Sequence, residues 1–110
     1  MELQCENRGE IRVVHVAGRI DSSNADEFGR DIRGVIAGGS RQLLLDFAGV
    51  PYINSAGLRA VLVAAKSLKM PGDRCVICGL SPEVKEIFEL AGFMNILRTY
   101  PSVEDAISHW

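Results

Sequence analysis

Residues 43–47, with the sequence LLLDF, form a nearly continuous apolar run in the middle of the chain. Such a run is typical of a central β-strand that is covered on both faces. On either side of it, residues 25–36 and 58–68 carry apolar side chains at helical spacing. The sequence therefore predicts an α/β fold arranged around this strand.

Shorter signals complete the predicted order ββαβαβαβα. Further strands are expected at residues 3–6, 11–17, 74–78 and 96–99, and further helices after the capping residues Ser81 and Ser102. A turn at residues 7–9 suggests that the first two strands form a hairpin, and the later strands are joined by helical crossovers. The expectation is a mixed, mainly parallel sheet of four to five strands with about four helices, in one domain that spans residues 1–110.

Size and composition limit what such a domain does. The chain has 110 residues, of which 47% are hydrophobic, enough for one ordinary core. Its formal charge is -2 without a basic tract, which disfavours nucleic acid as a partner, and no apolar run reaches the length of a membrane span. Three cysteines, an odd number, favour reduced thiols and a cytoplasmic location.

A single hydroxyl, that of Ser55, lies where the central strand gives way to the second predicted helix. A helix N-terminus accommodates a phosphate well, because its first N–H groups lack partners and its dipole end is positive. The ends of parallel strands are also where sites gather in α/β sheets. The alternative is that Ser55 only caps the helix. Gly57 disfavours that alternative, since glycine weakens a helix and suggests an accessible backbone.

The segment at residues 43–58, LLLDFAGVPYINSAGL, strongly resembles the signature of STAS domains, in the form found in bacterial anti-sigma factor antagonists. The resemblance extends to residues 18–21, 80–82 and 91–93, and so covers essentially the whole chain. In that family the serine of a D-S-x-G-L motif is phosphorylated by a kinase that is also the anti-sigma factor. The resemblance thus implies that Ser55 is the phosphoacceptor, with Asn54 in place of the usual aspartate.

The resemblance also implies a function and partners. The unmodified domain is expected to capture an anti-sigma factor that is an HPK-like serine kinase, phosphorylation of Ser55 is expected to release it, and a PP2C-type phosphatase is expected to reset the switch. No cofactor, metal or enzymatic activity is expected, and the oligomeric state is predicted as monomer or weak dimer. The expected partner-binding residues are Asp21, Ser22, Tyr52, Ile53, Asn54, Ala56, Gly57 and Leu58.

Local alternatives remain open for three of these residues. Asp21 fits a turn or cap before the first helix equally well. Tyr52 and Ile53 could face a partner, or they could pack into the core ahead of the helix.

Phosphorylation of Ser55 adds about -1.5 to -2 charge to the surface. The switch is therefore expected to act on the interface with the partner and to leave the fold intact.

Two other functions compete with the switch. A constitutive STAS scaffold, or an accessory subunit of a signalling complex or lipid transporter, would use the same fold without phosphorylation. A small hydrolase or nucleotide-binding enzyme would need a base for Ser55, or a phosphate loop. The sequence supplies neither, because residues 53–57 lack the first glycine of a G-x-S-x-G elbow and residues 38–40 are better interpreted as a helix stop.

The remaining reactive side chains are interpreted as structural. Cys75 and Cys78 have the spacing of a metal or redox pair, but three residues along a strand place them on opposite faces. His15 and His109 lack the context of a catalytic triad. Asp46 resembles a receiver phosphoacceptor only in its place at a strand end.

Overall fold

The computed structural model describes residues 1–95 and 97–110, and its element order matches the predicted ββαβαβαβα pattern. The strands are β1 (Glu2–Arg8), β2 (Ile11–Ala17), β3 (Gln42–Gly49), β4 (Arg74–Cys78) and β5 (Arg98–Tyr100). The helices are α1 (Ala25–Ala37), α2 (Ser55–Lys66), α3 (Pro82–Leu90), the short 3-10 helix η1 (Phe93–Asn95) and α4 (Val103–Ser108). The predicted α/β fold class is confirmed.

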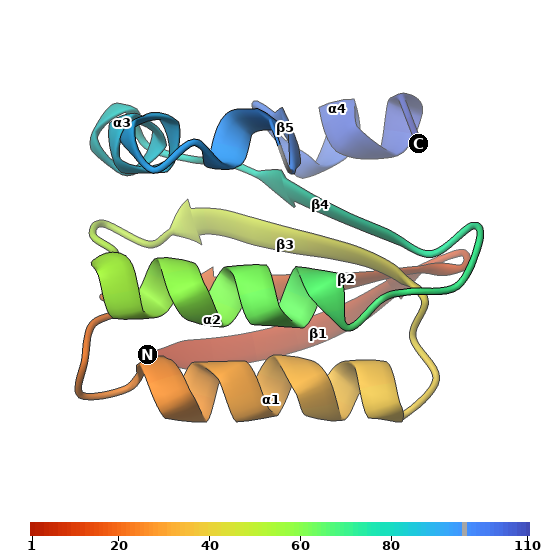
Figure 1. The fold of residues 1–110 in the computed structure, drawn as a ribbon. Coiled ribbons are helices and arrows are strands. Elements are labelled where there is room, and N and C mark those ends of the chain that lie inside the picture. Colours follow the sequence, from red (N-terminus) through yellow and green to blue (C-terminus); the bar gives the residue numbers. More distant parts are fainter. Residues whose placement is uncertain (96) are drawn as a thin grey trace.

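The five strands form one mixed sheet in the order β1-β2-β3-β4-β5. β1 pairs antiparallel with β2, and every later neighbour pairs in parallel. Because each parallel strand follows its neighbour in sequence, a helix crosses over between each successive pair (Figure 1). The carboxyl ends of β2 and β3 therefore meet at one end of the molecule, from which α1 and α2 start.

The boundaries differ from the expected ones at three places. The hairpin turn consists of Gly9 and Glu10, since Arg8 still pairs with Ile11. The second helix begins at Ser55, one turn before the first apolar residue of its periodic set. The last strand covers Arg98–Tyr100, and Ile96, where it was expected to begin, lies outside the described residues.

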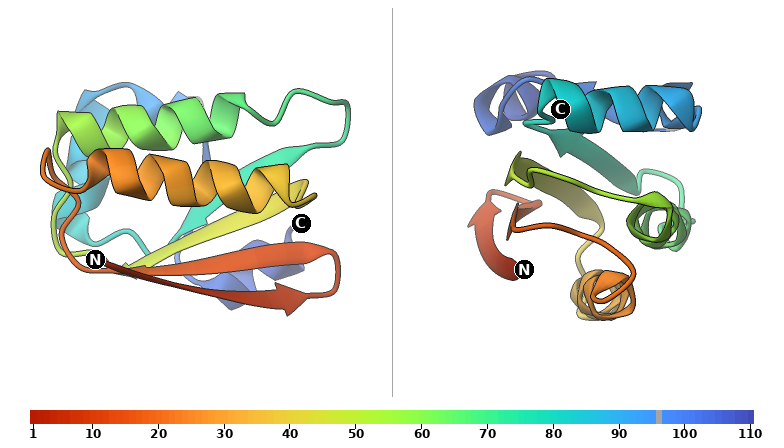
Figure 2. Two further views of the ribbon diagram at one scale, coloured as in Figure 1. Left: turned by 90° about the horizontal axis from the view of Figure 1, so that it is seen from below. Right: turned by 90° about the vertical axis from the view of Figure 1, so that its left-hand side faces the viewer.

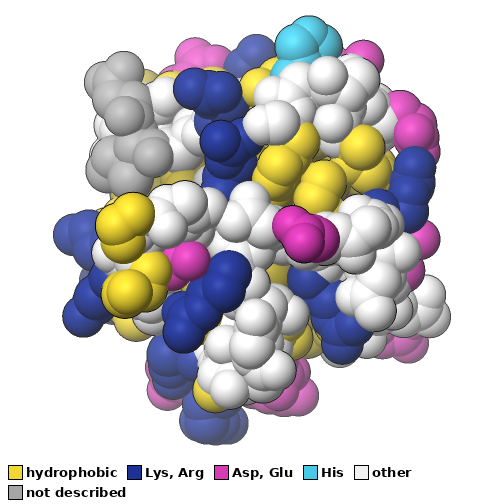
Figure 3. Space-filling view, turned by 90° about the vertical axis from the view of Figure 1, so that its right-hand side faces the viewer, with side chains coloured by type: hydrophobic (Ala, Val, Ile, Leu, Met, Phe, Trp, Pro, Cys, Tyr) yellow, Lys and Arg dark blue, Asp and Glu magenta, His cyan; other side chains and the backbone are white. Residues whose placement is uncertain are grey.

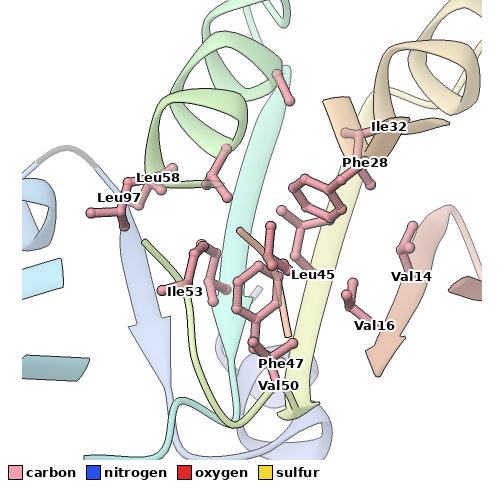
Figure 4. Close-up of a cluster of buried hydrophobic side chains, with 14 of the residues drawn as sticks. Val14, Val16, Phe28, Ile32, Leu45, Phe47, Val50, Ile53, Leu58 and Leu97 are labelled. Atoms are coloured by element: carbon pink, nitrogen blue, oxygen red, sulfur yellow. The ribbon is translucent and has the colours of Figure 1, made fainter. Parts of the chain in front are cut away.

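The two faces of the sheet are covered unequally. Side chains from α1, α2 and α3 pack on one face in a large core, and α4 packs on the other face in a small one (Figure 2). Edge-to-face contacts between aromatic rings run through the large core from Phe28 to Phe47 and on to Phe88. Figure 4 shows Phe47 and Ile53 in this core, beneath the helices that cover it. Every helix in the described part of the chain falls short of the length and apolar character needed to cross a bilayer.

Candidate functional site

Two loops lie side by side where β2 and β3 end. Ile20, after β2, forms an isolated parallel bridge with Ile53, after β3. The Ile20 N–H donates to the Tyr52 carbonyl at 3.0 Å, and the Asn54 N–H donates to the Ile20 carbonyl at 3.1 Å. Since both isoleucines are fully buried, this pairing fixes the start of α2 against the start of α1. The loop that carries the serine motif is thus held by backbone bonds.

Asn54, and not Ser55, caps α2. The Asn54 Oδ1 accepts from the Gly57 N–H at 3.1 Å, and its Nδ2 donates to the Ser22 Oγ at 3.2 Å. One amide therefore satisfies a free N–H of the helix and also ties the two loops together. An aspartate could accept at the first position but has no N–H to donate at the second.

Ser55 is the first residue of α2, and its side chain is exposed. Its hydroxyl makes no hydrogen bond to any residue in the described ranges. The alternative that Ser55 only caps the helix is therefore wrong, because Asn54 already fills that role. The hydroxyl is free to meet a partner at the positive end of the helix dipole.

Gly57, by contrast, is buried and does not expose its backbone, which corrects the expectation from sequence. A Cβ at this position would lie 2.6 Å from the Ile53 Cγ1 and 2.8 Å from the Ile20 Cγ2. Glycine is thus required for close packing of the helix start on the two loops. Ile53 and Leu58 are also buried, so their side chains pack into the core, as the alternative for Ile53 expected. The expected partner contact of these three residues stays a prediction.

Asp21 shapes the turn ahead of α1. Its Oδ1 accepts from the Ser23 hydroxyl at 2.5 Å and from the Ser23 N–H at 2.9 Å. These bonds, the hydroxyl one foremost, hold the pKa of Asp21 below its ordinary value. Asn24 precedes the helix but turns its side chain back, accepting from the Asp21 N–H at 2.9 Å. Asp21 therefore has a structural role, and its carboxylate is ionised near neutral pH.

The exposed surface around Ser55 combines aromatic, charged, polar and small apolar side chains. Tyr52 is 37% exposed, and the Arg19 guanidinium lies 4.6 Å from the centre of its ring. This cation-π contact gives the aromatic side chain a fixed position at the surface. Ser22 is exposed and Ala56 is half-buried. Of the expected partner-binding residues, Asp21, Ser22, Tyr52, Asn54 and Ala56 thus remain available near Ser55.

The hydrolase and receiver alternatives find no support in the geometry. His15 and Asp46 belong to the sheet face that packs against α4, whereas Ser55 begins a helix on the other face. Asp46 is held by its neighbours, since its Oδ1 accepts from the Ala48 N–H at 3.0 Å. His109 stacks on Tyr100 at the far end of the chain. Among the described residues, neither histidine forms a hydrogen bond with Ser55.

The cysteines are structural in their surroundings. Cys78 lies in the small core, while Cys75 packs against the large core on the opposite face. Burial raises the pKa of both thiols to about 12, so neither is a thiolate at neutral pH. Cys5 is exposed and all three thiols are free. Among residues 1–95 and 97–110, no group of three potential ligands is placed to hold a metal ion.

His15 links three strands on the partly open face of the sheet. Its Nε2 lies 2.6 Å from the Glu6 Oε1 of β1, and its Nδ1 lies 2.7 Å from the Asp46 Oδ2 of β3. The hydrogen bond to Glu6, followed by the bond and charge of Asp46, raises the pKa of His15 above its ordinary value in spite of partial burial.

The stability of the fold is therefore expected to depend on pH through His15. A raised pKa in the folded state means that the protonated imidazole stabilises the fold fully below about pH 6.5, and that this contribution is lost as pH rises through the folded-state value. The melting temperature, followed by circular dichroism from about pH 6 to about pH 9, should fall over this window. His15→Gln should remove the fall, and an unchanged slope in that variant would contradict the assignment.

This chain is similar in sequence and in fold to known proteins of one family. The family model described as STAS domain matches residues 2–106. The chain is 34% identical over 106 residues to BtrV of Bordetella bronchiseptica, named as a candidate anti-sigma factor antagonist, with 96% of this chain and 91% of BtrV aligned. The crystal structure of an anti-sigma factor antagonist from Mycobacterium paratuberculosis superposes with a TM-score of 0.91 at 23% identity, covering 98% of this chain and 92% of that one.

A second solved structure is that of SpoIIAA, a Bacillus cell fate determinant, in its phosphorylated form. It superposes with a TM-score of 0.72 at 21% identity, and the match covers 98% of each chain. The fold of this chain is thus the fold of these two solved structures. The chain belongs to the STAS domain family.

Proposed function

We propose that this protein is an anti-sigma factor antagonist whose binding to its partner is switched by phosphorylation of Ser55. The observation that carries the proposal is the exposed hydroxyl of Ser55, which has no hydrogen bond in the described part of the chain while Asn54 caps the helix. The names of relatives such as BtrV and the anti-sigma-B factor antagonist of Listeria monocytogenes support the function. The phosphorylated form of SpoIIAA supports the switch.

In the proposed reaction the Ser55 oxygen attacks the γ-phosphorus of ATP bound to the partner kinase. The hydroxyl proton passes to a base on the kinase, and ADP leaves. The protein supplies only the acceptor and is a binding protein with no catalytic step of its own. A PP2C-type phosphatase returns Ser55 to the free hydroxyl by hydrolysis.

The start of α2 tolerates the added charge. A phosphate at a helix N-terminus is favoured by the dipole and by free N–H groups. No acidic residue lies in the first turn of α2, so no carboxylate of the helix opposes the phosphate. Because the capping amide of Asn54 is separate from the acceptor, modification of Ser55 leaves the cap in place.

The unmodified surface is proposed to bind an anti-sigma factor of the HPK-like serine kinase type in the cytoplasm. Ser22, Tyr52 and Ala56 surround the acceptor, and Asp21 lies in the adjoining turn. Asn54 makes this surface less acidic than the family motif would, because an amide stands beside the acceptor. A partner kinase suited to this chain is expected to recognise the neutral side chain.

Protein recovered from its own cells tests the proposal. Intact-mass measurement and peptide mapping should place one phosphate on Ser55, and Ser55→Ala should lose it. In parallel, affinity capture with purified Ser55→Ala should retain a serine kinase, since the variant keeps the unmodified surface but does not turn over. If Ser55 carries no phosphate under any growth condition and the captured partner binds regardless, a constitutive scaffold role replaces the switch.

A further inference from the structure

A groove of about 270 Å³ runs between α1 and α2, next to the proposed acceptor. The two helices lie side by side on the same face of the sheet (Figure 2). The floor is formed by small residues, with Ala25 and Gly29 from α1 and Ala56 and Ala60 from α2. The small floor leaves a channel along the helix pair that a side chain of a partner can enter.

Three arginines surround this floor: Arg30 and Arg33 of α1 and Arg59 of α2. A Cβ added to Gly29 would lie 3.1 Å from the Arg33 Nη1, so the Arg33 guanidinium extends over the floor and glycine makes room for it. All three side chains are exposed, and none of them forms a salt bridge with any residue in the described ranges. Asp26 is the one acidic residue among those that line the groove.

The groove is therefore a basic surface on a chain whose formal charge is -2. Two other arginines are paired with carboxylates: Arg8 binds Glu104 at 3.0 Å, and Arg41 lies 3.6 Å from Asp73. At the end of the molecule opposite Ser55, basic and acidic side chains are interspersed over the visible surface (Figure 3). Arg30, Arg33 and Arg59 thus lie together on the α1/α2 pair, beside the proposed acceptor.

We propose that this groove docks an acidic segment of the protein partner, with Glu or Asp side chains paired to Arg30, Arg33 and Arg59. The inference rests on the proposed function, since it names the chemistry of the partner at the same site. Arginine forms bidentate pairs with carboxylates and is enriched at protein interfaces. Val63, 45% exposed at the end of the groove, adds an apolar contact for the same segment.

A protein segment fits the groove better than nucleic acid. Base stacking needs aromatic side chains, and the groove has none among its lining residues. Asp26 and the negative formal charge oppose a polyanion. A short acidic segment places a few carboxylates at the arginines without extending over the acidic remainder of the surface.

The position of the groove gives the phosphate a direct way to expel the partner. Ala56, next to the acceptor, lines the groove. Arg59 follows Ser55 by four residues in α2, so their side chains share one face of the helix. A phosphate on Ser55 would pair with Arg59 and add negative charge at the mouth of the groove. An acidic segment would then lose one arginine and meet a like charge.

The test uses the unmodified full chain and a fluorescently labelled, helical Glu- and Ala-rich peptide, with its Lys-for-Glu counterpart and a single-stranded oligonucleotide as comparison probes. The acidic peptide should bind at low salt and perturb amide NMR signals of α1 and α2. Arg33→Glu should weaken this binding roughly tenfold. The control Arg98→Glu, which changes an exposed arginine of β5 outside the groove, should leave it unchanged.

Thermal unfolding of both variants shows whether a loss of binding reflects a loss of fold. Absence of peptide binding, equal binding of the lysine peptide, tighter binding of the oligonucleotide, or indifference to Arg33→Glu would each overturn the docking proposal. None of these outcomes involves a kinase, so they leave the phosphorylation switch standing. Conversely, peptide binding by a protein whose Ser55 is never modified would remove the switch and keep the groove.

Discussion

Gly57→Ala is expected to destabilise the protein by about 1–3 kcal/mol, although glycine to alanine inside a helix ordinarily has the opposite effect. The reason is steric. The new Cβ would lie 2.6 Å from the Ile53 Cγ1 and 2.8 Å from the Ile20 Cγ2, and both side chains are fully buried. Both side chains are packed in the large core, so neither can move away without disturbing its neighbours there. The cost of overpacking should exceed the gain in helix propensity.

Gly34 provides a matched control in α1. It lies inside the helix, it is exposed, and a Cβ added there would meet nothing within 4 Å. Gly34→Ala should therefore stabilise the fold by about 0.5–1 kcal/mol. Urea denaturation of both variants measures the change in the free energy of unfolding, which should be negative for Gly57→Ala and positive for Gly34→Ala. A Gly57→Ala protein as stable as the Gly34→Ala protein would show that the helix start is loosely packed.

The predictable part of the fold is the part set by periodicity. In β3, α1 and α2, several apolar residues in each element indicate the same strand or helix. The packing of these elements against one another then stabilises the secondary structure that each pattern predicts. The boundaries are weaker signals. Asn54 and Ser55 are both good caps, so the sequence could not tell which one begins the helix. That difference of one residue decides whether the serine hydroxyl is occupied or free.

The candidate site depends on contacts between residues far apart in the sequence, which local sequence patterns do not predict. Tyr52 and Ile53 are adjacent and both apolar in character, yet the bridge to Ile20 buries one and leaves the other at the surface. Arg30, Arg33 and Arg59 each resemble ordinary solvated charges on amphipathic helices. Only the packing of α1 against α2 brings them around one groove, and the small residues of its floor, among them Gly29, are the local hint of that close approach.

Ser55→Glu is expected to weaken binding of the partner by about a hundredfold, which corresponds to about 3 kcal/mol. The carboxylate would stand at an exposed helix start between the Asp21 turn and the arginine groove. A partner shaped to the neutral surface would lose contact with Arg59 and meet a like charge, and such juxtapositions cost several kcal/mol in a desolvated interface. Stability should be unchanged or higher by up to about 1 kcal/mol, because the helix dipole favours an anion there.

Ser55→Gln separates charge from size in this experiment. Glutamine has nearly the volume of glutamate but no charge, so it should bind the partner more like Ser55→Ala than like Ser55→Glu. Calorimetric titration of the three variants with the captured kinase, together with melting curves, gives both quantities. Equal losses for glutamine and glutamate would mean that the surface excludes any larger side chain, and the electrostatic account of release would fail. A loss confined to glutamate, with the fold intact, would place the switch in the interface.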